Sequence, residues 1–179
     1  MTWKRAALYW AVFLGLAAYY MAAVRESRPP VAHPARAAFV TIPAEQVAGL
    51  ELRRGTNVVR CRRTGGRWEV IEPAERTVPS DLVEALVANL TELPDVEVVA
   101  DDSNTLGEFG LQEPQSEITL QRTGQAPLTV RLGGHNPAGT AVYAQRSDSP
   151  WVFLIGLNVR YYEDLLFEGL RQKGREGGG

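Results

Sequence analysis

The sequence predicts an α+β fold, with an N-terminal transmembrane helix followed by a mainly antiparallel sheet and two packed amphipathic helices. Three observations predict it: an uncharged apolar run, short strand-like runs between Gly-containing turns, and two Leu-rich segments with helical spacing. We expect an anchor at 1–27, a Pro-rich linker at 28–37, an extracytoplasmic domain at 38–171 and a disordered tail at 172–179.

The apolar run covers residues 6–24 and follows Lys4 and Arg5. A helix of this length spans roughly 28 Å at about 1.5 Å per residue, close to a hydrocarbon core about 30 Å thick. The alternative is a cleavable signal peptide. Because the run is long and aromatic and Met21–Ala23 makes a poor cleavage site, we predict an uncleaved signal anchor, with the C-terminal domain outside the cytoplasm.

Small residues recur along the anchor at spacings of three and four, which places them on one helical face. Such a face lets a second helix approach closely. An Ala-rich anchor also produces such a stripe by chance, and both interpretations stay open. The residues of this small-residue stripe are Ala7, Ala11, Gly15, Ala18 and Ala22.

Charge is unevenly distributed, although the net charge is only −2. Residues 1–76 hold 12 Lys/Arg and 6 Asp/Glu, giving +6, and residues 77–179 hold 7 and 15, giving −8. Anionic headgroups are the nearest counter-surface for a tethered basic patch. Nucleic acid is not expected, because no aromatic–basic interleaving accompanies the patch, and a solvated sheet face is the favoured interpretation. The patch comprises Arg53, Arg54, Arg60, Arg62, Arg63 and Arg67.

The first half of the domain has strand-like runs separated by Gly-containing turns. Ser80 is expected to cap an amphipathic helix that ends at Pro94. Cys61 is the single cysteine, so no internal disulfide forms, and we expect it to be a small buried hydrophobe. The predicted strands are Phe39–Ile42, Leu50–Leu52, Val58–Cys61, Trp68–Ile71 and Val96–Val99, with a turn or short helix at Pro43–Val47.

The second half repeats this pattern, with a final amphipathic helix that uses Val159 to Leu170. A strand–strand–strand–helix unit thus occurs near 50–93 and near 117–171, and an ancestral duplication with halves 38–99 and 100–171 is a hypothesis. The other predicted elements are a short helix at Thr105–Phe109 capped by Asp101–Ser103 and closed by Gly110, strands at Ile118–Leu120, Leu128–Leu132, Ala141–Gln145 and Trp151–Ile155, and a turn at Gly133–Thr140.

No constellation of catalytic or metal-ligating residues stands out. His33, His135 and Cys61 lack metal-ligand spacing, and no metalloprotease, nucleophile-elbow or P-loop pattern occurs. An EF-hand-like register starting at Asp102 places Leu106 where an oxygen ligand is required. We therefore expect no catalytic site, metal or cofactor. The candidate interaction turn comprises Gly133, Gly134, His135, Asn136, Pro137 and Gly139.

Three segments, taken in order, resemble a known family. They are Gly66–Val70 with Pro73 and the following Leu-rich helix, Leu106–Pro114 with its "GL-x-x-P" ending, and Leu132–Ala144 with its "G-x-x-x-P-x-G-x-x-x-Y-A" pattern. Over roughly residues 38–171 the chain resembles the bacterial family called domain of unknown function 4340. The resemblance implies a protein of the bacterial inner membrane with an extracytoplasmic domain, often encoded beside ABC-2 type transporter permeases and gliding-motility-type auxiliary proteins. It supplies no catalytic residues.

We expect a non-enzymatic accessory protein that docks its extracytoplasmic domain onto an integral membrane complex such as an ABC-type exporter. The expected partners are the membrane, crossed once, and an integral membrane protein, without nucleic acid and without an identified small-molecule substrate. The alternative is a ligand-binding module for glycans or lipid headgroups that uses the turn at Gly133–Thr140.

Overall fold

The computed structural model describes residues 3–26, 35–74, 77–93, 95–101 and 105–176, without the side chains of 4–8, 22–26 and 171–176. The chain divides into two compact units, 1–32 and 33–179. Several predicted features lie outside the described residues: most of the Pro-rich linker, His33, Pro94 and Asp102–Asn104.

The first unit contains one helix, α1 (Trp3–Glu26, 24 residues). Its described large apolar side chains, among them Trp10, Phe13 and Tyr20, are exposed within the unit. Searched over the described residues alone, the chain has no helix that is both long and apolar enough to cross a membrane. Of the small-residue stripe, Ala11, Gly15 and Ala18 have described side-chain positions, whereas those of Ala7 and Ala22 lie outside this set.

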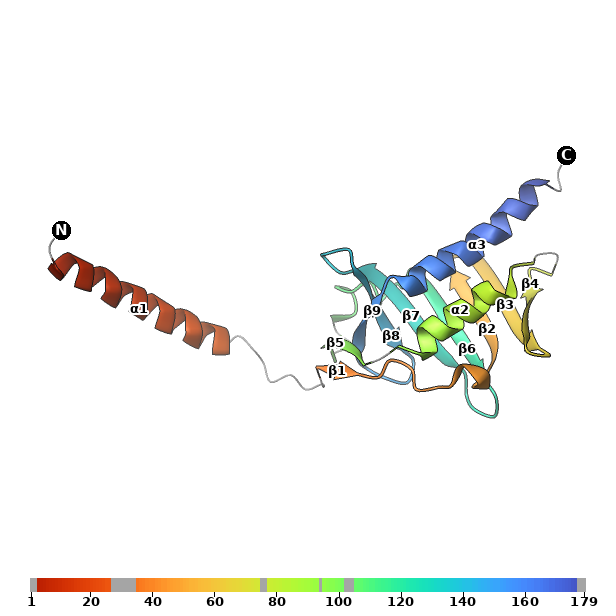
Figure 1. Ribbon diagram of the computed structural model, residues 1–179, viewed down its shortest axis with the longest axis horizontal. Coiled ribbons are helices and arrows are strands. Elements are labelled where there is room, and N and C mark those ends of the chain that lie inside the picture. Colours follow the sequence, from red (N-terminus) through yellow and green to blue (C-terminus); the bar gives the residue numbers. More distant parts are fainter. Residues whose placement is uncertain (1–2, 27–34, 75–76, 94, 102–104, 177–179) are drawn as a thin grey trace. The chain divides into compact units, whose positions relative to one another are not determined.

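In the second unit, the described residues form one nine-stranded antiparallel sheet with the order β1-β5-β9-β8-β7-β6-β2-β3-β4 (Figure 1). Together with the helices, this sheet confirms the predicted α+β class. The strands are β1 (Arg36–Ala37), β2 (Val47–Arg54), β3 (Asn57–Thr64), β4 (Arg67–Glu72), β5 (Val96–Ala100), β6 (Ser116–Arg122), β7 (Leu128–His135), β8 (Ala141–Arg146) and β9 (Val152–Gly156).

Two helices, α2 (Ser80–Thr91) and α3 (Asn158–Glu176), pack against each other and cover one face of this sheet (Figure 1). Their apolar positions recur at three-to-four spacing, so each helix buries one side against the inward side chains of the strands. Burying one Leu or Val side chain in this way contributes about 1.5–3 kcal/mol. The helix residues buried in the core are Val83, Leu86, Val87, Leu90, Val159, Leu166 and Leu170.

The strand order places β2 and β6 side by side in the interior of the sheet, where the two halves of the chain meet. From this pair, β3 and β4 extend outward on one side, and β7 and β8 extend outward on the other. Strand β9 follows β8, and β5, which comes after α2 in the chain, pairs with β9. The second half therefore has four strands before its helix instead of three, and both halves contribute to one core.

The predicted strand at Phe39–Ile42 is wrong, although the burial that motivated it is real. Phe39, Val40 and Ile42 are buried in the core, but this segment pairs with no described strand. The guanidinium of Arg146 donates hydrogen bonds to the carbonyl oxygens of Ala38 and Phe39. A side chain thus satisfies these backbone groups, as buried polar groups require, and the run needs no sheet partner. The short helix predicted next is confirmed as η1 (Ala44–Gln46).

Several further features differ from the prediction. Ser80 is the first helical residue and not a cap, because its Oγ accepts a hydrogen bond from the Trp68 amide at 2.8 Å. In the segment expected as a short helix at Thr105–Phe109, Thr105 is 3-10 helical and residues 106–110 form turns. Strand β7 continues to His135, and α3 continues to Glu176, so residues 172–176 of the expected tail are helical. The linker likewise ends earlier, since Arg36 and Ala37 form β1.

Candidate functional site

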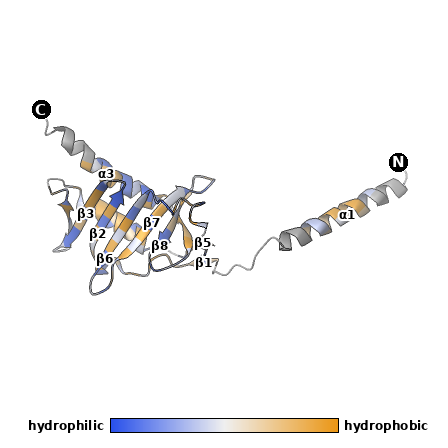
Figure 2. Cartoon of the chain, turned by 180° about the vertical axis from the view of Figure 1, so that it is seen from behind, coloured by the Kyte–Doolittle hydropathy of each residue, from blue (hydrophilic) through white to orange (hydrophobic). Residues whose placement is uncertain are grey.

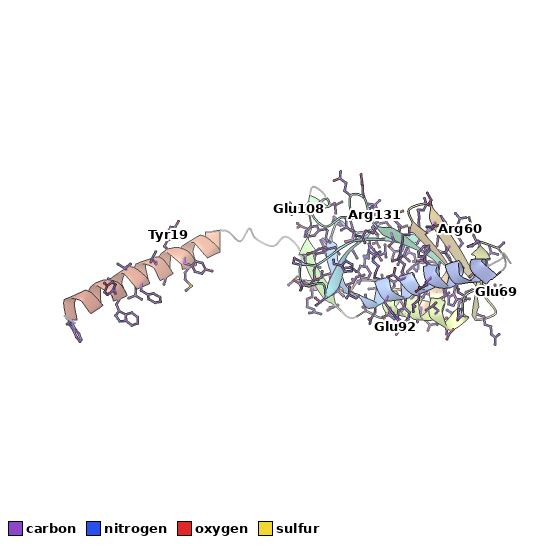
Figure 3. The ribbon with its side chains drawn as sticks, turned by 90° about the horizontal axis from the view of Figure 1, so that it is seen from above. Tyr19, Arg60, Glu69, Glu92, Glu108 and Arg131 are labelled. Atoms are coloured by element: carbon purple, nitrogen blue, oxygen red, sulfur yellow. The ribbon has the colours of Figure 1, made fainter. Side chains whose placement is uncertain are left out.

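The outer face of the sheet, which α2 and α3 leave uncovered, carries many of the polar side chains of the strands (Figure 2). Strand β3 shows the alternation that builds it: Val59 and Cys61 are buried toward the helices, and Arg60 and Arg62 lie on the outer face. Figure 3 shows Arg60 and Arg131 on the side of the sheet away from α3. Because side chains alternate along every strand, residues opposite one another form cross-strand rows on this face.

The central row is a chain of hydrogen-bonded and ion-paired groups. Arg60 contacts Glu72 on β4 and donates through Nε to Oε2 of Glu51 on β2 at 2.9 Å. Glu51 lies opposite Thr119 on β6, and the Thr119 and Thr129 hydroxyls are 2.9 Å apart. Every charge in this row therefore has a partner of opposite sign.

The arginines keep Glu51 ionised. The hydrogen bond from Arg60, supported by a second from Arg53, holds the pKa of Glu51 below its ordinary value, and partial burial opposes the shift. The same contacts raise the pKa of Arg60. The two groups thus act as a fixed pair of opposite charges and not as a proton donor and acceptor.

A second row, beside the first, runs through Arg53, Glu117 and Arg131, which are opposite one another in register. Arg53 is 3.1 Å from Glu51, and Arg131 is 3.5 Å from Glu117. With the Thr119 and Thr129 hydroxyls, these side chains line an open hollow of about 340 Å³. Its surface is polar and its charges are balanced.

The third row is interrupted by Gly49. Arg62 on β3 and Gln121 on β6 flank this glycine, and Glu69 on β4 lies opposite Arg62. The missing side chain leaves an open hollow of about 470 Å³, which Ile71 also lines. A bulge between Arg60 and Cys61 in the β3–β4 pairing places Ile71 there, and its side chain is 41 % exposed.

The six arginines of the predicted basic patch do not form one surface. Arg53, Arg60 and Arg62 lie on the outer face, and the first two are paired with glutamates. Arg54 and Arg63 belong to the helix side. Arg63 donates to Glu84 of α2 at 3.2 Å and lies over the Trp68 ring. Arg67 is exposed at the start of β4.

A buried ionic network on the helix side was not foreseen from the sequence. Glu163 of α3 is fully buried between Arg54, at 2.9 Å, and Arg160, at 3.3 Å. Arg160 also donates to Ser116 Oγ, Gln115 Oε1 and the Gly133 carbonyl oxygen, at 3.0, 3.1 and 3.0 Å. The network fastens α3 to the middle strands. Glu163 lies four residues after Val159 and three before Leu166, on the apolar side of the helix. This position is the sequence signal from which its burial could have been predicted.

The candidate interaction turn is held closed by its own asparagine. Gly133, Gly134 and His135 belong to β7, and the turn proper covers 136–140. Asn136 Oδ1 accepts hydrogen bonds from the amides of Thr140 and Ala141 at 2.8 and 3.1 Å. Pro137 and Gly139 are exposed, and Gly139 has a φ of +67°. The side-chain oxygen of Asn136 therefore stabilises the turn itself.

The glycines before this turn serve a close contact instead. A Cβ on Gly133 would lie 2.2 Å from the carbonyl oxygen of Phe109. The Phe109 ring packs on Tyr143 of β8, with centroids 4.8 Å apart, and Leu111 beside it is buried. The segment that ends in "GL-x-x-P" therefore docks on the Gly-rich end of β7.

The first segment singled out in the sequence has a comparable structural use. Besides the bond between its amide and Ser80, Trp68 donates through Nε1 to Oε2 of Glu84 at 2.7 Å. Strand β4 is thereby fastened to α2. All three segments hold elements of the fold together.

A family model, described as "Domain of unknown function (DUF4340)", matches residues 68–174. The chain belongs to the DUF4340 family. The match begins at Trp68 and includes the docking of Phe109 on Gly133, so these DUF4340 segments coincide with the fastening contacts described above. No curated protein and no solved structure matches the chain.

Metal-ligating and nucleophilic side chains do not gather in the described part of this DUF4340 chain. Within that part, no group of three or more His, Cys, Asp or Glu residues is placed to hold a metal ion. Cys61 is buried, and desolvation raises the pKa of its thiol to about 11. His135 is exposed at the end of β7. The chemistry that the outer face offers is the binding of charged and hydrogen-bonding groups.

Proposed function

We propose that the protein is a non-enzymatic, membrane-anchored accessory protein that docks its α+β domain onto an integral membrane complex, with an ABC-type transporter as the first candidate. The observation that carries this proposal is the outer face: an ordered surface of cross-strand rows that neither α2 nor α3 covers. Surfaces that bind other proteins reversibly are about as polar as the rest of the protein surface. A charge-paired, preorganised face meets that description.

The ion pairs of the outer face support docking over catalysis. Glu51, Arg60 and Glu72 hold one another in place, so a partner meets a surface whose side chains are already ordered. Preordered side chains lose little entropy on binding, and complementary charges give specificity more than raw affinity. A general acid or base would need a pKa near neutrality, and the pKa of Glu51 is displaced in the opposite direction.

The membrane anchor of the proposal comes from the sequence. Residues 6–24 are uncharged and long enough to span a bilayer, and the second unit follows on their C-terminal side. In the bacterial inner membrane, an N-in, C-out orientation would place the sheet domain outside the cytoplasm. There the outer face would meet the extracytoplasmic loops of a membrane partner.

Co-purification of the full chain in mild detergent tests the proposal. We expect recovery of an integral membrane protein in a fixed stoichiometry. A chain that elutes as a lone monomer and binds glycans or lipid headgroups would establish the alternative function and refute docking.

The small-residue stripe is a second proposed contact, through the anchor itself. Gly15→Leu should lower recovery of the complex, because a bulky side chain prevents close helix approach. Ala17→Leu is the matched control, since it adds the same side chain roughly 200° around the helix at about 100° per residue. Equal recovery for both variants would count against the stripe.

We also propose that the domain arose by duplication of a strand–strand–strand–helix unit. The central pairing of β2 with β6, with their successors extending in opposite directions, supports this origin. Superposition of β2, β3, β4 and α2 on β6, β7, β8 and α3 tests it. A fit that requires a different element order would contradict it.

A further inference from the structure

The hollow at Gly49 has a feature that the two charged rows beside it lack. The arginines of the two charged rows, Arg53, Arg60 and Arg131, are each within ion-pairing distance of a glutamate, unlike the arginine of the third row. The Arg62 side chain is exposed and forms no ion pair or hydrogen bond with any described residue. Glu69 lies opposite it in register, yet the two side chains are not ion-paired. Arg62 is therefore a cation available to a partner.

The surroundings of Arg62 define what fits there. Gly49 leaves room beside the guanidinium, and a Cβ at this position would approach Gln121 Cβ to 3.2 Å. The Gln121 side chain is exposed and offers an amide, and Ile71 offers an apolar surface at the rim. The remaining carboxylate in the lining, Glu51, is held by Arg60 and Arg53. The hollow thus combines a free cation, an amide donor and an aliphatic wall.

We infer that this hollow receives an acidic side chain from an extended segment of the membrane partner, with Arg62 as its counter-charge and Ile71 against a neighbouring apolar side chain. Guanidinium and carboxylate groups match in geometry and bind with two parallel hydrogen bonds. In an extended segment, side chains two positions apart share one face, so an acidic and an apolar residue in alternate positions would reach both groups.

The inference rests on the proposed function, because it assigns a contact within the same docking face. It commits to a protein segment as the occupant. A phosphate group of a lipid or of a free metabolite would use the same cation, but it would gain nothing from the wall that Ile71 provides. The contribution of Ile71 therefore separates the two classes of occupant.

Binding of a defined probe tests the inference on the full chain in detergent. The probe is a fluorescent eight-residue peptide in which each glutamate is followed by two valines. In an extended peptide, a Glu and the Val two positions later then share one face. Binding is measured by fluorescence anisotropy, beside a control peptide with Lys in place of Glu. We expect the acidic peptide alone to bind. Arg62→Gln should weaken it about fivefold or more, the upper range for an exposed ion pair, and Arg62→Lys should weaken it less. Ile71→Thr should also weaken it. Arg131→Gln, which removes the same charge from the paired part of the face, should leave the affinity within about twofold.

Three results would overturn the inference: equal affinity for Arg62→Gln and Arg131→Gln, indifference to Ile71→Thr, or displacement of the peptide by an equal concentration of glycerol 3-phosphate. The last result would make the hollow a phosphate site. Thermal melting of each variant confirms that it is folded.

The outcome is separable from that of the proposed function. If the wild-type chain recovers a membrane partner and Arg62→Gln recovers it equally well, docking stands and the hollow is not the contact. If no partner is recovered but the peptide binds through Arg62, the preference of the hollow for an acidic segment stands and docking onto a membrane complex does not.

Discussion

The backbone amide of Gly134 donates a hydrogen bond to the carbonyl oxygen of Phe109 at 2.9 Å. This bond joins β7 to the segment that comes just before β6 in the chain. It forms only because the neighbouring Gly133 has no side chain, which lets the Phe109 carbonyl approach the strand. The register shift in the β7–β8 pairing lies at the same point, between Leu132 and His135, so the bulge and the docking form one feature.

Gly133→Ala should destabilise the domain. Its Cβ would lie 2.2 Å from the Phe109 oxygen, so the docked segment has to move, and overpacking of this kind costs roughly 1–3 kcal/mol. Gly134→Ala is the control, because its Cβ would lie 3.7 Å from the same oxygen. Urea denaturation measures both. Similar midpoints for the two variants would show that the close approach is unimportant.

Glu163→Gln should destabilise the domain by about 3 kcal/mol or more, because it leaves two arginines without their buried counter-charge. The neighbouring Asp164 binds the same Arg54 at 2.7 Å, but its side chain is 55 % exposed. Asp164→Asn should therefore cost less than about 1 kcal/mol. Chemical denaturation compares the pair, and a loss as large for Asp164→Asn would contradict a burial-dependent effect.

The Cys61 thiol should resist labelling in the folded chain. Burial raises its pKa to about 11 from 9.0, so the reactive thiolate is absent near neutrality. Reaction with a thiol-specific chromogenic disulfide at about pH 8 should be slow in native buffer and fast in urea. Rapid labelling in native buffer would contradict the burial of Cys61.

The same shift has a consequence for stability. A pKa raised on folding contributes stability that is present below pH 9.0 and is lost as the pH rises through about 11. Unfolding free energies measured between these values should decline, and Cys61→Ala should remove that part of the decline.

Glu51 should titrate below its ordinary pKa, because Arg60 and Arg53 donate hydrogen bonds to its carboxylate. Its contribution to stability is present above the unfolded value of 4.5 and is lost as the pH falls through the lower folded value. Carboxyl carbon NMR measures this pKa directly. Arg60→Gln should raise it toward 4.5, and high salt should have the same effect by screening the pair. A pKa unchanged in Arg60→Gln would refute the role of Arg60.

Much of the sheet could be predicted from local signals. Gly55, Gly65 and Gly124 mark hairpin turns with positive φ, and the strands between them alternate in polarity. The turn residues and the two-residue period of the strands therefore indicated the same elements. The buried face of α2 was visible in its Leu and Val spacing. These features depend on neighbours in the sequence, and sequence patterns report neighbours well.

The failures share a different cause, since each depends on a contact between distant residues. Phe39 looks like a strand residue, but Arg146, 107 positions away, satisfies its carbonyl. Ser80 looks like a cap, but Trp68 donates to it. The arginines of the basic patch do not share one surface, because neighbouring arginines on a strand point to opposite faces. The glutamates that pair with some of them come from other elements. Tertiary partners overrode the local reading in each case.

The pairing of β5 with β9 constrains how the chain is made. Apart from the two-residue β1, the sheet neighbour of residues 96–100 is the strand at 152–156. Strand β2 pairs with the adjacent β3, but its second neighbour is the distant β6. Pairings so distant in sequence slow folding, since chain entropy is lost before the contacts form. Nearly the whole domain would have to be synthesised before the sheet is complete. If the chain is translocated across a membrane during synthesis, folding would take place after translocation. The strands of the first half would remain without their distant partners until the second half had crossed.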